Sequence, residues 1–330
     1  MLILCVPSQA LYILLRLIIF MNSVDKNERK SVFWYVLLGA MLVFVFIILP
    51  IIFLMLVFGA DSHGSGNVAV IPINGVIMTS RGSSFGSEYV GSDDVVKFIS
   101  EASSDDSIKA IILEINSPGG SAVASDEIAM AVKKVDKPII TVIREAGASG
   151  GYWIASSTDY IIANRMSITG SIGVISSYLE FSGIMEKYGV GYERLTAGKY
   201  KDIGTPFREP TDEERAILEK KLDRIHEFFI SEVASNRHMD VETIRKLATG
   251  EFYLGVEAQE MGLVDELGAY PEAERYLSSQ YGVVSPMYVR YESQPGLLSI
   301  LMGTLSSASF HVGEGIASGV SDQSARPQLR

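Results

Sequence analysis

The sequence predicts an α/β domain with a mainly parallel β-sheet, attached to an N-terminal transmembrane helix. Residues 32–60 contain no charged side chain, and at about 1.5 Å per residue they exceed the roughly 30 Å hydrocarbon core of a bilayer. Beyond them, short strands that are almost uniformly apolar alternate with helical segments, a pattern typical of parallel sheets covered on both faces. Tight turns such as residues 74–75 (Asn-Gly) separate these segments.

The apolar run at residues 32–60 is the predicted transmembrane anchor. A buried core helix is the alternative, but such helices rarely run this far without a polar residue, and the run is too long for a signal peptide. Pro50 lies inside it, where we expect a kink or tilt and not a break. Residues 61–67 are Ser- and Gly-rich and read as a flexible linker.

The charges on either side of the anchor predict its orientation. Lys26, Arg29 and Lys30 precede the anchor, whereas the next positive charge after it is Arg81. Because Lys and Arg are retained on the cytoplasmic side, residues 1–31 should be cytoplasmic and the large domain should lie outside the cytoplasm.

The first 20 residues are also apolar but are interrupted by Arg16 and by polar residues near Pro7. Met21 is a possible true start, in which case residues 1–20 are an upstream extension included by mistake. Alternatively, this stretch is a second membrane-associated segment.

The soluble part has a clear order of elements. Strands are expected at residues 68–73, 109–115, 138–143, 161–163, 173–176 and 191–195, and helices at 92–102 and 122–135 and around Trp153. Thr211 and Glu214 form a capping-box pattern that starts a long helix with one apolar stripe, and His226 lies off that stripe, which predicts a solvated side chain. The domain should span residues 68–285, and residues 286–330 form a tail that is partly disordered.

Composition excludes several kinds of site. The net charge of −11 argues against nucleic acid as a partner. The single cysteine, Cys5, precedes the anchor, so the domain has neither a disulfide nor a thiol nucleophile. The 4 histidines do not occur at metal-ligand spacing, and we expect neither a metal nor another cofactor.

Residues 145–153 (Glu-Ala-Gly-Ala-Ser-Gly-Gly-Tyr-Trp) form a Gly-rich corner between a strand and a helix. Such a corner exposes Ser149, and the helix N-terminus behind it offers amide donors suited to an oxyanion. In the alternative interpretation, Ser149 only caps the helix.

A serine nucleophile needs a base, and none of the histidines follows a strand end. A lysine can serve if burial favours its neutral amine. Lys199 and Lys201 flank Tyr200 in a Gly-bounded loop, so that only one of them can be buried. In the alternative interpretation, both are ordinary solvated lysines.

Several motifs together resemble the signal peptide peptidase A family, in its short form with one catalytic domain. They are residues 116–120 (Asn-Ser-Pro-Gly-Gly), 148–152 (Ala-Ser-Gly-Gly-Tyr), 169–174 (Thr-Gly-Ser-Ile-Gly-Val), 201–203 (Lys-Asp-Ile) and the stretch 250–268. The resemblance covers residues 68–281, and no internal repeat suggests the double-length form.

The resemblance implies a ClpP/crotonase-like fold of repeated ββα units and a membrane-bound serine endopeptidase with a Ser-Lys dyad. By motif, Ser149 is the nucleophile, Lys201 is the general base and Ser171 orients the lysine amine. The amides of Gly120 and Gly150 form the oxyanion hole. Lys199 matches the motif less well than Lys201.

The resemblance also implies substrates, assembly and location. Remnant signal peptides and other unfolded exported polypeptides are the expected substrates. A homo-oligomer is expected, in which the base reaches the serine of a neighbouring subunit. The expected location is the bacterial inner membrane, crossed once, with the catalytic domain on the extracytoplasmic side.

Two other functions fit part of the sequence. An acyl-CoA enzyme of the crotonase type shares the fold but requires neither the pair of Ser149 and Lys201 nor an exported domain. A catalytically degenerate membrane scaffold would have lost Ser149, Lys201 or a glycine of the two Gly-Gly pairs, and all of these are present.

Overall fold

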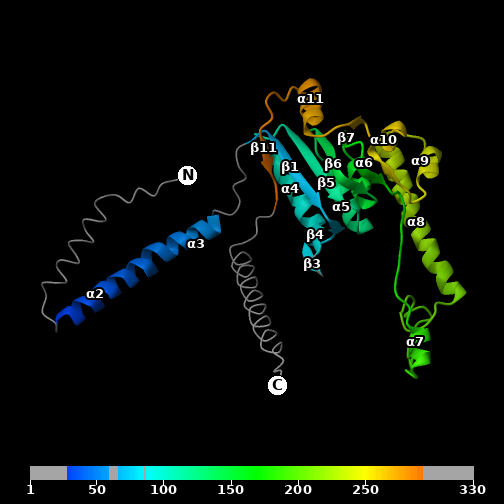
Figure 1. Cartoon of the computed structure of the whole chain (residues 1–330), viewed down its shortest axis with the longest axis horizontal. Helices are drawn as coiled ribbons and strands as arrows, with labels where there is room; N and C mark the ends of the chain where they lie inside the picture. The colour runs from blue at the N-terminus through cyan, green and yellow to red at the C-terminus, as the bar shows by residue number, and fades with distance from the viewer. Residues whose placement is uncertain (1–27, 59–65, 85–86, 293–330) are drawn as a thin grey trace, which may run out of the picture. The chain divides into compact units, whose positions relative to one another are not determined.

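The computed structural model describes residues 28–58, 66–84 and 87–292, and the chain divides into two compact units, Met1–Ser62 and His63–Arg330. In the first unit, the described residues form one continuous helix: α2 (Glu28–Val43), a π-helical turn η1 (Phe44–Ile48) and α3 (Leu49–Phe58) (Figure 1). Residues 1–27, including Cys5, lie outside the described residues.

The π-helical turn directly precedes Pro50. Proline lacks an amide hydrogen and its ring crowds the carbonyl four residues earlier, so a wider turn there keeps the helix unbroken. Within this helix, Trp34–Phe53 has a mean hydropathy of 3.1 and none of it is buried in the protein. Its length and composition suit a membrane span.

The second unit is built around a mostly parallel sheet, as the sequence predicts. The strand order is β10-β7-β6-β5-β1-β11, and each of these neighbouring pairs is parallel. β8 continues the sheet parallel to the far part of β6, and β9 pairs antiparallel with β8. The strands are β1 (Val68–Asn74), β5 (Ala110–Ser117), β6 (Ile139–Ala148), β7 (Tyr160–Ala163), β8 (Ile168–Gly170), β9 (Phe252–Leu254), β10 (Glu266–Leu267) and β11 (Tyr288–Arg290).

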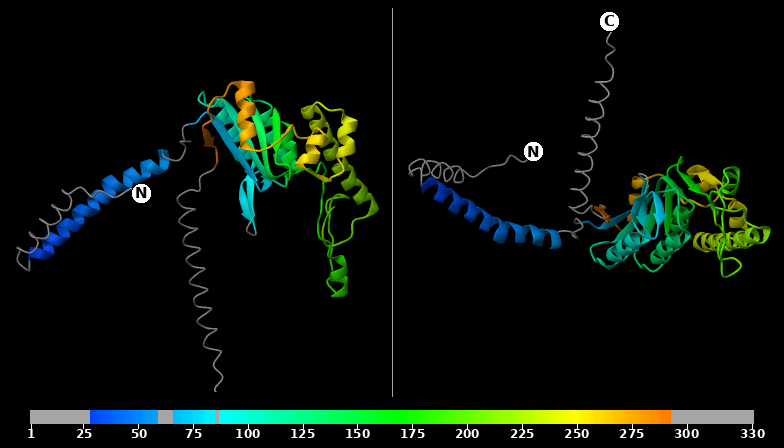
Figure 2. Two further views of the ribbon diagram at one scale, coloured as in Figure 1. Left: turned by 45° about the horizontal axis from the view of Figure 1, so that its top comes forward. Right: turned by 90° about the horizontal axis from the view of Figure 1, so that it is seen from below.

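Helices cover both faces of this sheet (Figure 2). Ala69, Ile71 and Ile73 pack with the helices that precede and follow β5 and β6, whereas Val68 and Val70 pack on the opposite face with the last helix. Both faces of β1, β5, β6 and β7 are therefore largely buried, which explains why these central strands are mostly apolar. The helices are α4 (Ser92–Ser104), α5 (Ala122–Val132), α6 (Gly150–Ser156), α7 (Ser182–Lys187), α8 (Asp212–Arg237), α9 (Val241–Leu247), α10 (Gly255–Glu260) and α11 (Tyr270–Tyr281).

A small second sheet lies beside the main one. It has the order β2-β4-β3, with β2 (Val76–Met78), β3 (Gly82–Ser84) and β4 (Ser87–Gly91). Ile77 of β2 forms an isolated bridge to Gly120. This bridge fastens the loop after β5 to the rest of the domain.

Some predicted elements are wrong. Residues 173–176 and 191–195 form no strand, because they belong to a segment that extends away from the sheet and has no strand beside it. The sheet also continues past the predicted domain limit at residue 285, since β11 (Tyr288–Arg290) pairs with β1.

Candidate active site

Ser149 occupies the sharp turn between β6 and α6. Its backbone has φ 52° and ψ −121°, an unfavourable conformation for a side-chain-bearing residue that typically costs about 1–3 kcal/mol. Two hydrogen bonds hold the turn: the Ser149 amide donates to the Gly170 carbonyl at 2.8 Å, and the Trp153 amide donates to the Ser149 carbonyl at 2.9 Å. The Ser149 side chain forms no capping hydrogen bond with α6, which disfavours the interpretation of Ser149 as a simple cap.

The loop after β5 packs directly against this turn. Gly119 has φ 103°, and a Cβ atom there would lie 2.8 Å from the Ser149 Cβ and 2.7 Å from the Gly150 nitrogen. Only glycine allows the two turns to approach this closely. The Ile77 amide donates to the Gly119 carbonyl at 2.9 Å, which holds the loop in place.

Gly120 and Gly150 lie side by side in this contact. A Cβ atom built on Gly150 would be 3.3 Å from the Gly120 nitrogen. Among the hydrogen bonds of the described residues, none is donated by the backbone amide of Gly120 or Gly150. Two adjacent backbone donors without acceptors are the arrangement that binds an oxyanion.

Ser171 comes from a third segment, directly after β8. Its backbone is also left-handed, with φ 50°, and its Oγ donates to the Gly250 carbonyl at 3.2 Å. The Ser171 amide donates to the Glu251 carbonyl at 2.9 Å, so the segment before β9 holds Ser171 in place.

A cavity of about 830 Å³ brings these segments together. Its lining includes four of the residues that the sequence singles out: Gly120, Ser149, Gly150 and Ser171. The apolar stripe of α8 supplies another wall, with Leu222, Ile225 and Phe229. The cavity thus combines a serine with an apolar lining, which suits an apolar peptide side chain.

Two aromatic residues on the cavity wall were not assigned to the site from the sequence. Trp153 stacks on Phe229 with ring centroids 4.8 Å apart. Trp153 lies in the same Gly-rich corner as Ser149, and Phe229 lies on the apolar stripe of α8, so the sequence places each residue in an element but does not bring them together. That they form a wall of one cavity follows from the packing of α6 against α8.

His226 corrects another expectation. It lies off the stripe but lines the cavity, and its buried Nε2 has no hydrogen-bond partner among the described residues. His226 is half-buried because the face of α8 that lines the cavity includes it beside Leu222 and Ile225.

Lys201 lies on the arm, by which we mean residues 174–209, between β8 and α8. It is exposed, is not part of the cavity lining and forms no ion pair among the described residues. Figures 1 and 2 show the arm extending away from the sheet, with α7 near its far end. Within one chain, the structure therefore brings Ser149 together with Ser171, Gly120 and Gly150 but not with Lys201.

Lys199, the alternative lysine, is differently placed. Its Nζ lies 2.6 Å from a Glu213 carboxylate oxygen, and this hydrogen bond raises the pKa of Lys199 above its ordinary value. A raised pKa favours the charged ammonium form, which cannot accept a proton. This pairing makes Lys199 a poor candidate for a general base.

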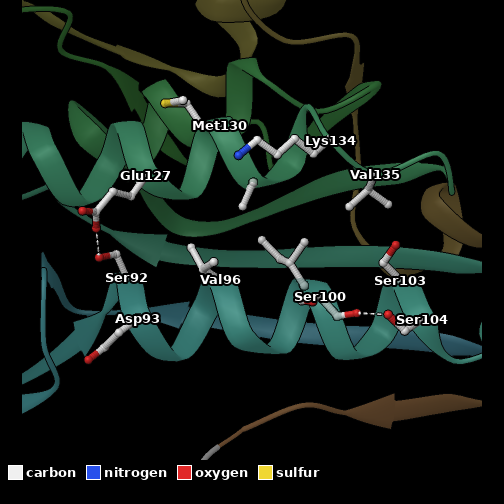
Figure 3. Close-up of a pocket in the computed structure, with 12 residues that line it drawn as sticks. Ser92, Asp93, Val96, Ser100, Ser103, Ser104, Glu127, Met130, Lys134 and Val135 are labelled. Atoms are coloured by element: carbon white, nitrogen blue, oxygen red, sulfur yellow. Dashed lines mark hydrogen bonds between the residues drawn. The ribbon is translucent and has the colours of Figure 1, made fainter.

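A second groove, of about 510 Å³, runs between α4 and α5 (Figure 3). Its lining is largely the helix faces around Val96 and Met130, and Ser92 Oγ donates to Glu127 at 2.5 Å at one end. None of the predicted site residues lines this groove. The cavity at Ser149 is therefore the candidate active site.

Comparison with known proteins agrees with this assignment. Residues 131–283 match the model of peptidase family S49. A Methanocaldococcus jannaschii protein assigned as a protease is 35% identical over 231 residues, 69% of this chain and 72% of its own length. An Enterococcus faecium protein assigned as the signal peptide peptidase SppA is 35% identical over 237 residues, 70% of this chain and 69% of its own length.

A longer relative matches through part of its length. Protease 4 of Haemophilus influenzae is 34% identical over 211 residues, which are 62% of this chain and 33% of that protein. The S49 fold is ClpP/crotonase-like, in agreement with the mixed α/β unit and its parallel sheet. The chain belongs to peptidase family S49 and is a serine protease.

Proposed function

We propose that this chain is a membrane-anchored endopeptidase with a Ser149–Lys201 dyad that cleaves remnant signal peptides. The observation that carries the proposal is the placement of Ser149, on a strained turn at a cavity, beside the unbonded amides of Gly120 and Gly150. A nucleophile beside vacant backbone donors is what acyl transfer requires.

The proposed reaction gives each of these groups one role. The neutral amine of Lys201 takes the proton of Ser149 Oγ as the oxygen attacks the carbonyl carbon of the peptide. The oxyanion of the tetrahedral intermediate accepts hydrogen bonds from the amides of Gly120 and Gly150. The Lys201 ammonium then protonates the leaving amine, which yields an acyl-enzyme. Lys201 next takes a proton from a water molecule as its oxygen attacks the ester carbonyl. The ester C–O bond then breaks, the acid product leaves, and the Lys201 ammonium returns the proton to Ser149 Oγ.

We further propose that Lys201 serves the Ser149 of a neighbouring copy. This arrangement is supported by the arm, which carries Lys201 away from the body of its own chain. Several apolar side chains of the arm are largely exposed, with Ile175 and Leu195 each 89% accessible. Burial of such side chains against a second copy would stabilise an oligomer and supply the dry surroundings that a neutral lysine needs.

The anchor supports the proposed substrate and location. The helix Trp34–Phe53 is long and apolar enough to cross a bilayer, and the positive charges before it favour a cytoplasmic N-terminus. The catalytic unit would then work at the outer surface of the cell membrane, where fragments of cleaved signal peptides remain. The apolar lining of the cavity suits their hydrophobic segments.

The substrate is tested by incubating the full chain in detergent with a synthetic signal peptide and with a denatured soluble protein. Mass spectrometry maps the bonds cleaved, and the Ser149→Ala variant serves as the blank. We expect cleavage after small or apolar residues and faster turnover of the signal peptide. Cleavage confined to charged sites, or equal turnover of both substrates, would reject signal peptides as the preferred substrate.

The oxyanion hole is tested by Gly120→Ala. A Cβ atom there would lie 2.0 Å from the Ile77 carbonyl oxygen, so the loop must move and carry its amide out of position. Because one oxyanion donor contributes about 10²–10³-fold to the rate, we expect a loss of kcat of that order. Gly82→Ala is the control, since its Cβ would approach no atom closer than 3.8 Å. Full activity in Gly120→Ala would remove Gly120 from the site.

A further inference from the structure

The arm is fastened to α8 through the guanidinium of Arg208. Arg208 donates to both oxygens of Asp202, from Nε at 3.1 Å and from Nη2 at 3.2 Å. It also donates to both oxygens of Glu214, from Nη1 at 2.7 Å and from Nη2 at 2.5 Å. One side chain thus bridges the residue next to Lys201 and the first turn of a long helix. Below, the three residues together are called the Arg208 clamp.

The helix side of the clamp is firmly held. Glu214 is only 4% exposed, and one of its oxygens accepts the Thr211 amide at 2.9 Å. The Glu214 amide donates back to Thr211 Oγ1 at 3.3 Å, completing a capping box. The Arg208 guanidinium lowers the pKa of Glu214 to about 2, so this carboxylate stays charged at physiological pH.

The lysine side of the clamp is held by Asp202. The hydrogen bonds from Arg208 keep the pKa of Asp202 below its ordinary value. Arg194 reaches the same carboxylate at 2.5 Å and donates to the Lys199 carbonyl at 3.1 Å. On one side of Lys201 the Lys199 carbonyl is bound by Arg194, and on the other the Asp202 carboxylate is bound by Arg208, which Glu214 links to α8.

We propose that Arg208 is a positioning residue for Lys201, which it fixes relative to α8 through Asp202 and Glu214. The inference rests on the proposed role of Lys201 as general base. A lysine has a flexible four-carbon stem, so its amine reaches a serine reproducibly only if its backbone is fixed. A displacement of about 1 Å in a catalytic group costs about 10²-fold in rate. Arginine suits the task because its planar fork can bind two carboxylates at once, whereas the ammonium of lysine is a point charge.

The test compares Arg208→Gln with Arg215→Gln in the full chain. Arg215 is an exposed neighbour of Glu214 and forms no side-chain hydrogen bond or ion pair among the described residues. Its replacement therefore removes one positive charge and leaves the Arg208 clamp intact. For Arg208→Gln we expect kcat at neutral pH to fall about 10- to 100-fold, with the KM of a short peptide nearly unchanged. Arg215→Gln should behave as wild type.

The pH–rate profile separates positioning from general damage. A base displaced from a dry site into water keeps its proton to higher pH, so the acid limb of the Arg208→Gln profile should move to higher pH and activity should partly recover there. Arg208→Lys should show most of the same loss. Oligomer size is measured in parallel and should match wild type. Arg208→Gln should unfold at a lower temperature than wild type, because the buried Glu214 carboxylate loses its cationic partner, so activity is compared well below that temperature.

Asp202→Asn keeps the inference testable if Arg208→Gln does not fold. It weakens the bond next to Lys201 and leaves the bond between Arg208 and Glu214, and it should produce the same shift of the acid limb. The double variant should be no less active than the less active single variant, since both substitutions break the same interaction between Arg208 and Asp202. The positioning role of Arg208 would be overturned if Arg208→Gln or Asp202→Asn kept the wild-type kcat and pH profile while Lys201→Ala was inactive. The proposed dyad would still stand in that case. An active Lys201→Ala would instead overturn the dyad itself.

Discussion

Replacement of Ser149 by alanine is expected to abolish peptide hydrolysis and leave the fold intact. Without Oγ there is no nucleophile, and loss of a catalytic serine typically costs about 10⁴–10⁶-fold in rate. The fold should survive because the turn is held by backbone hydrogen bonds from the Ser149 amide and to its carbonyl. The measurement is turnover of an unstructured protein substrate, with thermal unfolding recorded in parallel.

Ser149→Gly provides a matched control for this experiment. Glycine adopts φ 52° and ψ −121° without the strain that a side-chain-bearing residue carries. Ser149→Gly should therefore be as inactive as Ser149→Ala but unfold at a higher temperature than that variant. The pair separates loss of chemistry from loss of structure. Substantial turnover by either variant would remove Ser149 as the nucleophile.

Lys201 has the second largest expected effect. Both Lys201→Ala and Lys201→Arg should be inactive, because alanine carries no base and a guanidinium stays protonated. Lys199→Ala should retain most activity, since Lys199 pairs with Glu213 on the arm surface. Peptide turnover is measured for all three variants at several pH values. An active Lys201→Arg would show that Lys201 is not the general base, and an inactive Lys199→Ala would favour Lys199 in that role.

Mixed oligomers test whether sites are shared. Protomers with Ser149→Ala and protomers with Lys201→Ala are co-expressed in equal amounts. If each site takes Ser149 from one copy and Lys201 from the next around a closed ring, about one quarter of the sites hold both intact residues. Activity near that fraction is expected. A mixture as inactive as its components, with mixing confirmed by mass spectrometry, would show that each site is built within one chain.

Much of the fold was accessible from the sequence because its signals are local. The apolar strands β1, β5, β6 and β7 lie where the sequence predicts them, since strands buried on both faces must be apolar throughout. The start of α8 was also predictable, because the capping box of Thr211 and Glu214 is satisfied within one turn. The family was likewise readable from motifs that each lie within a few residues.

Only the tertiary structure decided which of these pieces meet. The close approach of Gly119 to Ser149 depends on strands that are neighbours in the sheet but distant in the chain, and no local pattern specifies it. Residues 191–195 of the arm show the opposite case: the sequence predicts a strand there, but none forms, because a strand needs a hydrogen-bonded neighbour. The Arg208 clamp was not predicted either: Asp202 and Glu214 each lie six residues from Arg208, a spacing that matches no local motif, and only the folded arm brings the three charges together. Strands, caps and motifs depend on residues that are close in the chain, so the sequence predicts them. Contacts between separate segments depend on how the folded elements pack, so only the tertiary structure shows them.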